Sequence, residues 1–144
     1  SIMDRKPFAD ALFVSYGSGP PSAERIPYVC GTALTLEILQ RLTAQIRSGC
    51  VRSVHLDDEA RENSLIADFR SGWATVYIVK DVEHYYELVN DQFPDCGTQL
   101  TITGDGPTPQ RHATQDMALM SEIIAHFAQT GGVYPACTWE HTVH

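Results

Sequence analysis

Carboxylates are the side chains in this sequence whose number and placement could do chemistry, and most of them lie in one stretch. Residues 57–95 hold ten acidic and three basic side chains, a net charge of −7 (ten minus three), whereas the other 105 residues hold eight acids and seven bases. Phosphate contacts require Lys and Arg, so this balance argues against nucleic-acid binding. A concentrated negative field attracts and orients a basic macromolecule, although an acidic surface can also serve solubility alone.

Two groups of residues within this stretch are candidates for contacting a basic partner. The first is a run of acids at 57–62, and the second combines acids with two tyrosines at 81–91. Tyr85 and Tyr86 would point to opposite faces of a strand, so we expect at most one of them to be exposed. The candidate partner-binding residues are Asp57, Asp58, Glu59, Glu62, Asp81, Glu83, Tyr85, Tyr86, Glu87 and Asp91.

The same carboxylates make a poor catalytic pair. Asp57 with Asp58, and Glu83 with Glu87, lie in a solvated acidic stretch, and nothing in the sequence marks a pocket that would shift their pKa values. The sequence also contains no G-x-S-x-G, H-E-x-x-H, P-loop or G-x-G-x-x-G motif. We therefore predict no catalytic residue and no enzymatic activity.

The four cysteines favour a reduced, structural role. No two of them form a C-x-x-C pair, and the first basic residues are not followed by the apolar region of a signal peptide. Cys137 with His112 or His126, or Cys96 near His84, could form a nucleophilic pair, but nothing close in sequence would lower the thiol pKa. We therefore expect buried thiols in a protein of the cytoplasm.

Histidine offers no clear metal site. His141 and His144 lie three residues apart, and they would share a face only if this segment were helical. We expect a frayed chain end there instead, because terminal residues are usually poorly ordered. We predict neither a bound metal nor a cofactor.

Length and composition indicate one globular domain, residues 1–144. Apolar residues make up 43% and charged residues 19% of the chain, which is ordinary for a globular protein. No segment approaches the roughly 18 apolar residues of a membrane-spanning helix. We take Met3 as the start residue, with Ser1 and Ile2 as a vector remnant.

Two helices are predicted from apolar residues at three- and four-residue spacing. The first covers 32–48, with Thr32 or Thr35 as its N-cap and a glycine directly after its end. The second follows a Thr114 cap, carries a stripe of Met and Ile residues, and stops at Gly131.

Strands are predicted where the apolar period changes to two. The segment 73–79 is almost wholly apolar, which predicts a central strand covered on both faces. The segment 82–89 alternates, although a helix is an alternative there. The order of elements favours an α+β fold, an antiparallel sheet of about five to six strands with two main helices packed on one face. The predicted strands are 11–16, 51–56, 64–70, 73–79, 82–89, 97–103 and 136–140.

The C-terminal third carries a resemblance to a known family. A Met- and Ile-striped helix at 114–127 precedes the run QTGGVYPACTWE at 129–140. This succession of helix, Thr-Gly, spacer, Pro and Trp-Glu resembles the first-described family of immunity proteins in bacterial polymorphic toxin systems. The segments 32–37 and 64–79 look like the family's opening helix and central hairpin, so the likeness spans residues 28–141.

Two segments depart from the family pattern. Residues 81–96 are richer in Tyr and acids than the family leads us to expect, and the Gly/Pro loop at 17–22 has no counterpart. We expect partner specificity to reside in such segments, so the identity of the toxin stays open.

The resemblance implies a protein that binds and neutralises a cognate bacterial toxin inside the producing cell. Members of the family guard against toxins that include nucleic-acid deaminases. A toxin that acts on DNA or RNA has a basic groove, which an acidic, aromatic-bearing surface can fill. The alternatives are a small cytosolic α+β enzyme or ligand-binding domain with an unrecognised pocket, and a structural or adaptor module.

Overall fold

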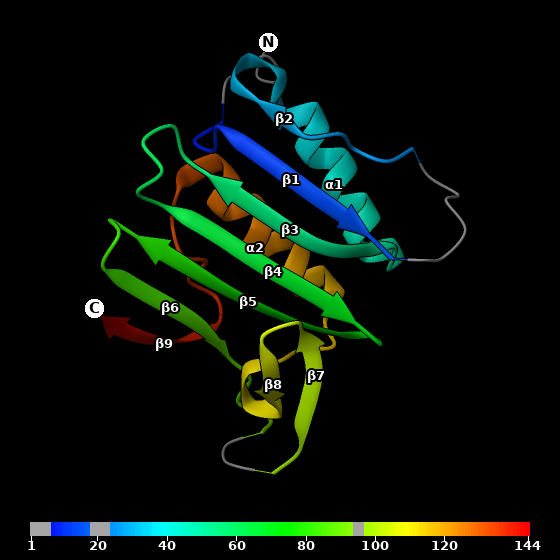
Figure 1. The fold of residues 1–144 in the computed structure, drawn as a ribbon, viewed down its shortest axis with the longest axis vertical. Helices are drawn as coiled ribbons and strands as arrows, with labels where there is room; N and C mark the ends of the chain where they lie inside the picture. The colour runs from blue at the N-terminus through cyan, green and yellow to red at the C-terminus, as the bar shows by residue number, and fades with distance from the viewer. Residues whose placement is uncertain (1–6, 18–23, 94–96) are drawn as a thin grey trace.

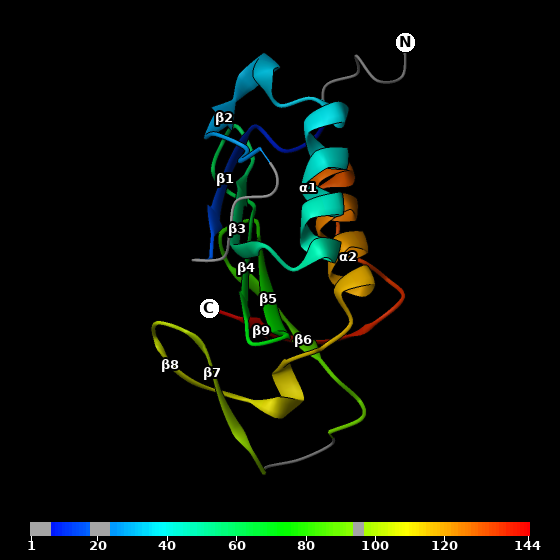
Figure 2. The same ribbon diagram turned by 90° about the vertical axis from the view of Figure 1, so that its right-hand side faces the viewer.

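Seven antiparallel strands form one sheet in the spatial order β2-β1-β3-β4-β5-β6-β9, and both helices lie on the same face of it (Figures 1 and 2). The computed structural model describes residues 7–17, 24–93 and 97–144, so the predicted loop at 17–22 and Cys96 fall wholly or largely outside it. The predicted α+β class and the placement of both helices on one face are confirmed. The main sheet has seven strands rather than about five to six, and its edge strand β2 was not predicted. The elements are β1 (Ala11–Tyr16), β2 (Val29–Cys30), η2 (Gly31–Ala33), α1 (Leu36–Ser48), β3 (Val51–Asp57), β4 (Ser64–Arg70), β5 (Trp73–Lys80), β6 (His84–Val89), β7 (Gln99–Thr103), β8 (Gly106–Pro109), η3 (Gln110–His112), α2 (Met117–Thr130) and β9 (Thr138–Val143).

Capping fixes where α1 begins and ends. The Thr35 hydroxyl accepts a hydrogen bond from the Ile38 N–H (3.3 Å), so the helix starts at Leu36. The residues before it form the short 3-10 turn η2 rather than the predicted first turn of the helix. Gly49 ends α1 in the left-handed conformation (φ 84°), which a residue without Cβ adopts at little cost.

The predicted Thr114 cap of α2 is wrong. The backbone of Thr114 exchanges two hydrogen bonds of 2.8 Å with that of Ala74 in β5, so Thr114 is held in an extended bridge. The carboxylate of Asp116 caps the helix instead, accepting from the Leu119 N–H at 2.9 Å. Gly131 ends α2 as predicted, again in the left-handed region.

The core lies between the sheet and the two helices. Every second residue of the central strands points toward the helices, and the apolar faces of α1 and α2 meet them. Burial of one large apolar side chain stabilises a fold by about 1.5–3 kcal/mol. The largest fully buried side chains are Phe127, Leu12, Leu34, Leu42, Ile46, Leu56, Leu65, Ile78, Leu88, Ile102, Met120 and Ile123.

The opposite face of the sheet is open, which corrects the prediction that 73–79 is covered on both faces. In β5, Ala74, Val76 and Ile78 are buried, whereas Tyr77 is 38% exposed. Figure 2 shows the reason, because both helices pack against the same face. In the part of the chain that the structure describes, no helix covers the other face.

The predicted strand 97–103 exists as β7, but it lies outside the main sheet. It pairs with β8, which was not predicted, in a two-stranded hairpin at one end of the open face (Figures 1 and 2). Ile102 is buried, and the Arg52 guanidinium donates hydrogen bonds to the carbonyl oxygens of Ile102 (3.0 Å) and Phe69. These contacts fix the hairpin to the sheet as a wall beside the open face.

The segment His141–Val143 does not fray, so that prediction is wrong. Strand β9 runs to Val143 and pairs with the whole of β6. It begins at Thr138, two residues after the predicted start at 136. The His141 ring stacks on the Tyr86 ring with centroids 4.3 Å apart, and its Nε2 lies 3.0 Å from Nδ1 of His84. These cross-strand contacts hold β9 on the edge of the sheet.

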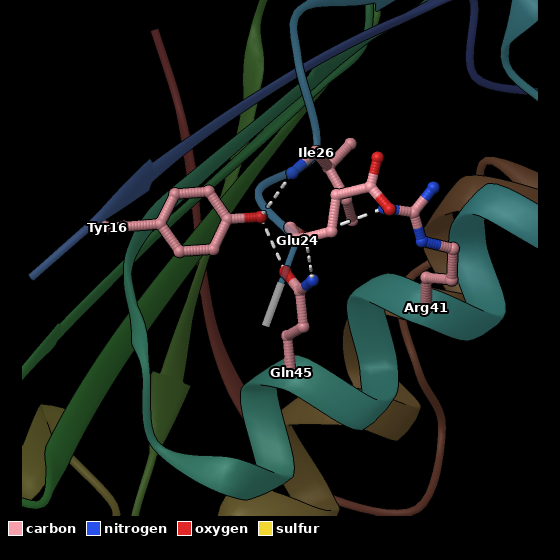
Figure 3. Close-up of polar contacts among 5 residues, drawn as sticks. All are labelled: Tyr16, Glu24, Ile26, Arg41 and Gln45. Carbon is pink, nitrogen blue, oxygen red and sulfur yellow. Dashed lines mark hydrogen bonds and ion pairs between the residues drawn. The ribbon is translucent and has the colours of Figure 1, made fainter. Parts of the chain in front are cut away.

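A polar cluster fastens the segment before β2 to α1 (Figure 3). The Tyr16 hydroxyl accepts a hydrogen bond from the Ile26 N–H (2.8 Å) and donates one to Oε1 of Gln45. The Gln45 side-chain amide donates to the Glu24 carbonyl oxygen (2.8 Å), and Arg41 lies 4.0 Å from the Glu24 carboxylate. The cluster therefore ties the strand β1, the helix and the intervening segment into one unit.

Candidate functional surface

The first predicted acidic group and the beginning of the second, at 81–83, lie at the same end of the sheet and touch each other. The β3–β4 and β5–β6 turns are adjacent there (Figure 1). The Val82 N–H donates to the Glu62 carbonyl oxygen (2.8 Å), and the Asp81 N–H donates to Oδ1 of Asn63 (3.0 Å). We call the combined surface the acidic rim; it consists of Asp57, Asp58, Glu59, Glu62, Asp81 and Glu83.

The tip of the β5–β6 turn has an unusual backbone. Asp81 and Val82 both have positive φ, at 52° and 68°. A β-branched residue rarely adopts this conformation, which costs roughly 1–2 kcal/mol for a residue with a Cβ. Val82 is nevertheless 58% exposed, so the acidic rim carries a strained apolar side chain at its tip.

Among the rim carboxylates, Asp58 is the one whose oxygens are hydrogen-bonded within its own turn. Its carboxylate accepts hydrogen bonds from the Glu62 N–H (2.9 Å), the Asn63 N–H (3.2 Å) and the Asn63 side-chain amide (2.8 Å). Partial burial raises the pKa of Asp58, but the hydrogen bonds from Asn63 and Glu62 outweigh this effect, and the pKa lies below its ordinary value. Asp58 therefore shapes the β3–β4 turn.

The remaining rim acids differ in whether they form an ion pair within the described part of the chain. Asp57 lies 3.2 Å from Nε2 of His55. Among the described residues, Glu59, Glu62, Asp81 and Glu83 form no ion pair, and all four are exposed. These four carboxylates therefore carry the field that a basic partner would meet.

Three other predicted residues lie away from the rim. Glu87 is on the open face, where its carboxylate lies 3.7 Å from Nε2 of His112. Asp91 follows the far end of β6 and accepts a hydrogen bond from the Thr138 hydroxyl (2.8 Å). Tyr86 faces the helices and packs against the core. The structure therefore does not bring them together with the rim.

The two tyrosines of β6 point to opposite faces, as the strand prediction required. Tyr85 lies on the open face and is 36% exposed, with His144 packed edge-on against its ring (centroids 4.9 Å). Tyr86 lies on the helix-covered face and stacks on His141. Only Tyr85 is available to a partner.

A row of side chains that sequence reasoning missed crosses the open face. The strand register aligns Phe13, His55, Ile66 and Tyr77 on β1, β3, β4 and β5, one beside the next. Phe13 is 53% exposed, although a phenylalanine with this much exposed surface is unusual in an isolated domain. The available signal was the period-two alternation, which places Phe13 opposite the buried Leu12 and Val14.

Asp68 and Asp105 form a second feature that the sequence did not single out. Asp68 is half-buried on β4, and Asp105 lies at the tip of the β7–β8 hairpin. Burial raises the pKa of Asp68; the charge of Arg52 opposes this, and the charge of Asp105 adds to it, leaving the pKa above its ordinary value. Burial and the negative charges of Asp68 and Asp105 likewise raise the pKa of Tyr77. Asp68 and Tyr77 are diagonal neighbours on the open face, because Asp68 pairs with Thr75 and Ile66 pairs with Tyr77.

Two clefts open at the end of the sheet opposite the rim, and Trp73 lines both. The first encloses about 540 Å³ and is also lined by Arg52 and Arg70. The second encloses about 520 Å³ and is also lined by Phe93 and Cys137. Burial raises the pKa of the Cys137 thiol to about 11, so this thiol is protonated near neutral pH and a poor nucleophile. The prediction of mostly buried thiols is wrong for the described cysteines, because Cys30 is exposed and Cys50 and Cys137 are only half-buried.

Within residues 7–17, 24–93 and 97–144, no three His, Cys, Asp or Glu side chains lie close enough together to hold a metal ion. In the same described ranges, neither helix is long and apolar enough to cross a membrane. Comparison of the chain with family models, curated proteins and solved structures gives no match. The surface of the molecule itself is therefore the basis for a proposed function.

Proposed function

We propose that this chain is an immunity protein, which binds a cognate bacterial toxin in the cytoplasm of the producing cell and neutralises it. The observation that supports the proposal is the acidic rim. Two acidic segments some 20 residues apart in the sequence are joined by the bond from the Val82 N–H to the Glu62 carbonyl oxygen. Their exposed carboxylates and one exposed valine make a surface suited to a basic protein.

The proposed mechanism is steric and electrostatic. A toxin that acts on DNA or RNA presents a basic substrate groove, and the rim would occupy it in place of the polyanion. If the toxin is a nucleic-acid deaminase, closing its base pocket or strand channel is sufficient, and the immunity protein has no need to touch the metal. This role requires no catalytic residue and no cofactor in this chain, and it serves competition between bacteria.

Binding to the protein encoded beside this chain's gene tests the proposal. We expect the two proteins to form a complex whose affinity falls as salt rises, because the rim charges are exposed. Expression of this chain should also protect cells from that protein. A neighbouring gene product that neither binds nor harms unprotected cells would contradict the proposal.

Charge reversal then tests the surface. Glu59→Lys combined with Glu83→Lys alters one residue in each rim turn and should slow association about tenfold or more. Glu37→Lys, at an exposed acid in the first turn of α1 in the helix layer, is the control of the same chemistry and should slow association much less. Because Glu37→Lys alters the net charge by +2 and the double change by +4, an effect of Glu37→Lys about half as large on a logarithmic scale would mean that only the total charge matters.

A ligand-binding domain is the second candidate, and the two clefts beside Trp73 are the observation that favours it. Each has a volume in the range of small-molecule sites. Thermal-shift screening of metabolites against the wild-type chain and Trp73→Ala distinguishes this function. A ligand that stabilises only the wild type would support it, and absence of any such ligand beside a tight toxin complex would exclude it.

A further inference from the structure

We infer that the open sheet face between β1 and the β7–β8 hairpin is a docking platform for an arginine-bearing segment of a partner protein, with the guanidinium seated between Asp68 and the Tyr77 ring. This inference rests on the proposed function, because it names where and by what chemistry the toxin makes its second contact. It concerns residues that lie outside the acidic rim, so the two surfaces can be tested apart.

The first support is the kind of side chain on this face. An antiparallel sheet with one solvated face normally carries polar residues there. Here Phe13, Ile66, Tyr77 and Tyr85 come from four strands and face the same side, and the register places the first three in one row with His55 between Phe13 and Ile66. A contiguous apolar surface rimmed by charge is typical of a protein interface.

The second support is the shape of the platform. The β7–β8 hairpin stands at one end of the open face (Figure 2). Its position is set by the buried Ile102 and by the Arg52 guanidinium, which bridges the carbonyl oxygens of Ile102 and Phe69. The platform therefore has a wall that is already in place before a partner arrives, which reduces the entropy lost on binding.

The third support is a carboxylate without a hydrogen-bond donor. Among the described residues, Asp68 accepts no hydrogen bond, although it is half-buried, and the charge of Asp105 on the wall opposes its own. Arg52 is the nearest cation that acts on it, and its guanidinium is already bonded to two carbonyl oxygens. A cation from a partner would supply a charged donor and relieve the repulsion.

Arginine fits this space better than lysine or a nucleic acid. Its planar guanidinium can pair with the Asp68 carboxylate through two hydrogen bonds and can stack on the Tyr77 ring. An ammonium group forms only point contacts. A polyanion would be repelled by Asp68 and Asp105, so a nucleic acid is excluded as the occupant.

Titration of the full chain with hexa-arginine and hexa-lysine peptides, followed by backbone amide NMR shifts, tests the chemistry without the toxin. We expect hexa-arginine to shift amides of β4, β5 and the hairpin tip, and to bind this face at least about threefold more tightly than hexa-lysine. Asp68→Asn and Tyr77→Ala should each weaken that binding about three- to tenfold. Glu37→Gln, on the helix-covered side, is the matched control and should have no effect. Shifts confined to the acidic rim, or equal binding of the two peptides, would overturn the inference.

A stability measurement excludes a merely structural role for Asp68. If the Asp68 carboxylate contacts a partner and does not stabilise the fold, Asp68→Asn should weaken binding. The free Asp68→Asn chain should then unfold at a higher temperature than the wild type. A structural carboxylate would give the opposite result, a lower unfolding temperature. Phe13→Ser gives an independent test, because it removes exposed apolar area and should weaken binding with little change in unfolding temperature.

The toxin complex separates this inference from the proposed function. A toxin that binds the chain equally well after Asp68→Asn and Tyr77→Ala, but not after Glu59→Lys with Glu83→Lys, would overturn the docking platform and support the proposed function. A neighbouring gene product that does not bind, together with hexa-arginine shifts on the open face, would contradict the proposed function and support the platform.

Discussion

The two faces of the main sheet carry similar apolar side chains but differ in how far these side chains are exposed. On the covered face, Leu65 and Ile78 have no exposed surface, and the helices bury them. On the open face, Phe13 is 53% and Tyr77 38% exposed. Apolar residues on the covered face are needed for folding, whereas those on the open face contribute little to folding and are available for binding. The difference shows that the strand pattern alone does not separate a folding residue from a contact residue.

The largest expected effect compares two phenylalanines on these faces. Phe127→Ala removes a ring with no exposed surface and should lower the free energy of unfolding by about 3–5 kcal/mol. Phe13→Ala should change it by less than about 0.5 kcal/mol, because the ring is already in water. Urea denaturation followed by circular dichroism measures both. Comparable losses would mean that the open face is part of the folding core.

A smaller effect compares two neighbouring acids of the rim. Asp58→Ala removes a carboxylate that accepts three hydrogen bonds and should lower the free energy of unfolding by about 1–2 kcal/mol, whereas Glu59→Ala should leave it nearly unchanged. The folded-state pKa of Asp58 is lowered, so its stabilisation is present above the ordinary value of 3.8 and is lost as the pH falls through the folded-state pKa. Denaturation of both variants from pH 7 down into the acid range should show the difference shrink once the pH falls below 3.8.

Relief of strain at the rim tip should stabilise the chain by a similar or smaller amount. Val82→Gly should raise the free energy of unfolding by about 0.5–1 kcal/mol, because glycine adopts the observed φ of 68° without a Cβ clash. Val82→Ala keeps the Cβ and is the control, so it should bring no comparable gain. If Val82→Gly also weakens toxin binding, the strained valine is a contact residue of the rim.

The smallest effect is expected from Asp68→Asn on the free chain. The folded-state pKa of Asp68 is raised, so its charged form opposes folding once the pH rises through that value. The substitution should therefore raise the unfolding temperature slightly at pH 7, and the gain should vanish below the ordinary pKa of 3.8. A loss of stability at pH 7 would show that the Asp68 charge is needed in the fold.

The strands with one buried face were the easiest elements to predict. Segment 64–70 places Leu65, Ala67 and Phe69 on one side, segment 11–16 is rich in strand-forming residues, and the observed strands have the same limits. The residue pair Ser71-Gly72 between two apolar strands is typical of a tight hairpin turn. In the structure both residues have the positive φ that a two-residue hairpin requires. Local residue type fixes such features with little help from the rest of the fold.

Features that depend on distant partners could not be predicted. Its residue type makes Thr114 a plausible helix cap, but its backbone forms a bridge with Ala74 in β5, which no local pattern reveals. Strand β8 contains Pro107 and Pro109, which argue against a strand except at an edge such as this hairpin. Sequence reasoning likewise could not separate Asp58, which is bonded within its turn, from the free Glu59 beside it. In each case a tertiary contact overrides the local signal.

The hydrogen bond from the Val82 N–H to the Glu62 carbonyl oxygen has a consequence for engineering. Because it joins the two hairpin tips, neither tip keeps its position if the other is replaced. A chimera that exchanges recognition between two such proteins should therefore transplant the 57–64 and 80–84 loops as a matched set, with Asn63 included. Grafting a single loop would leave the recipient with a mispaired surface.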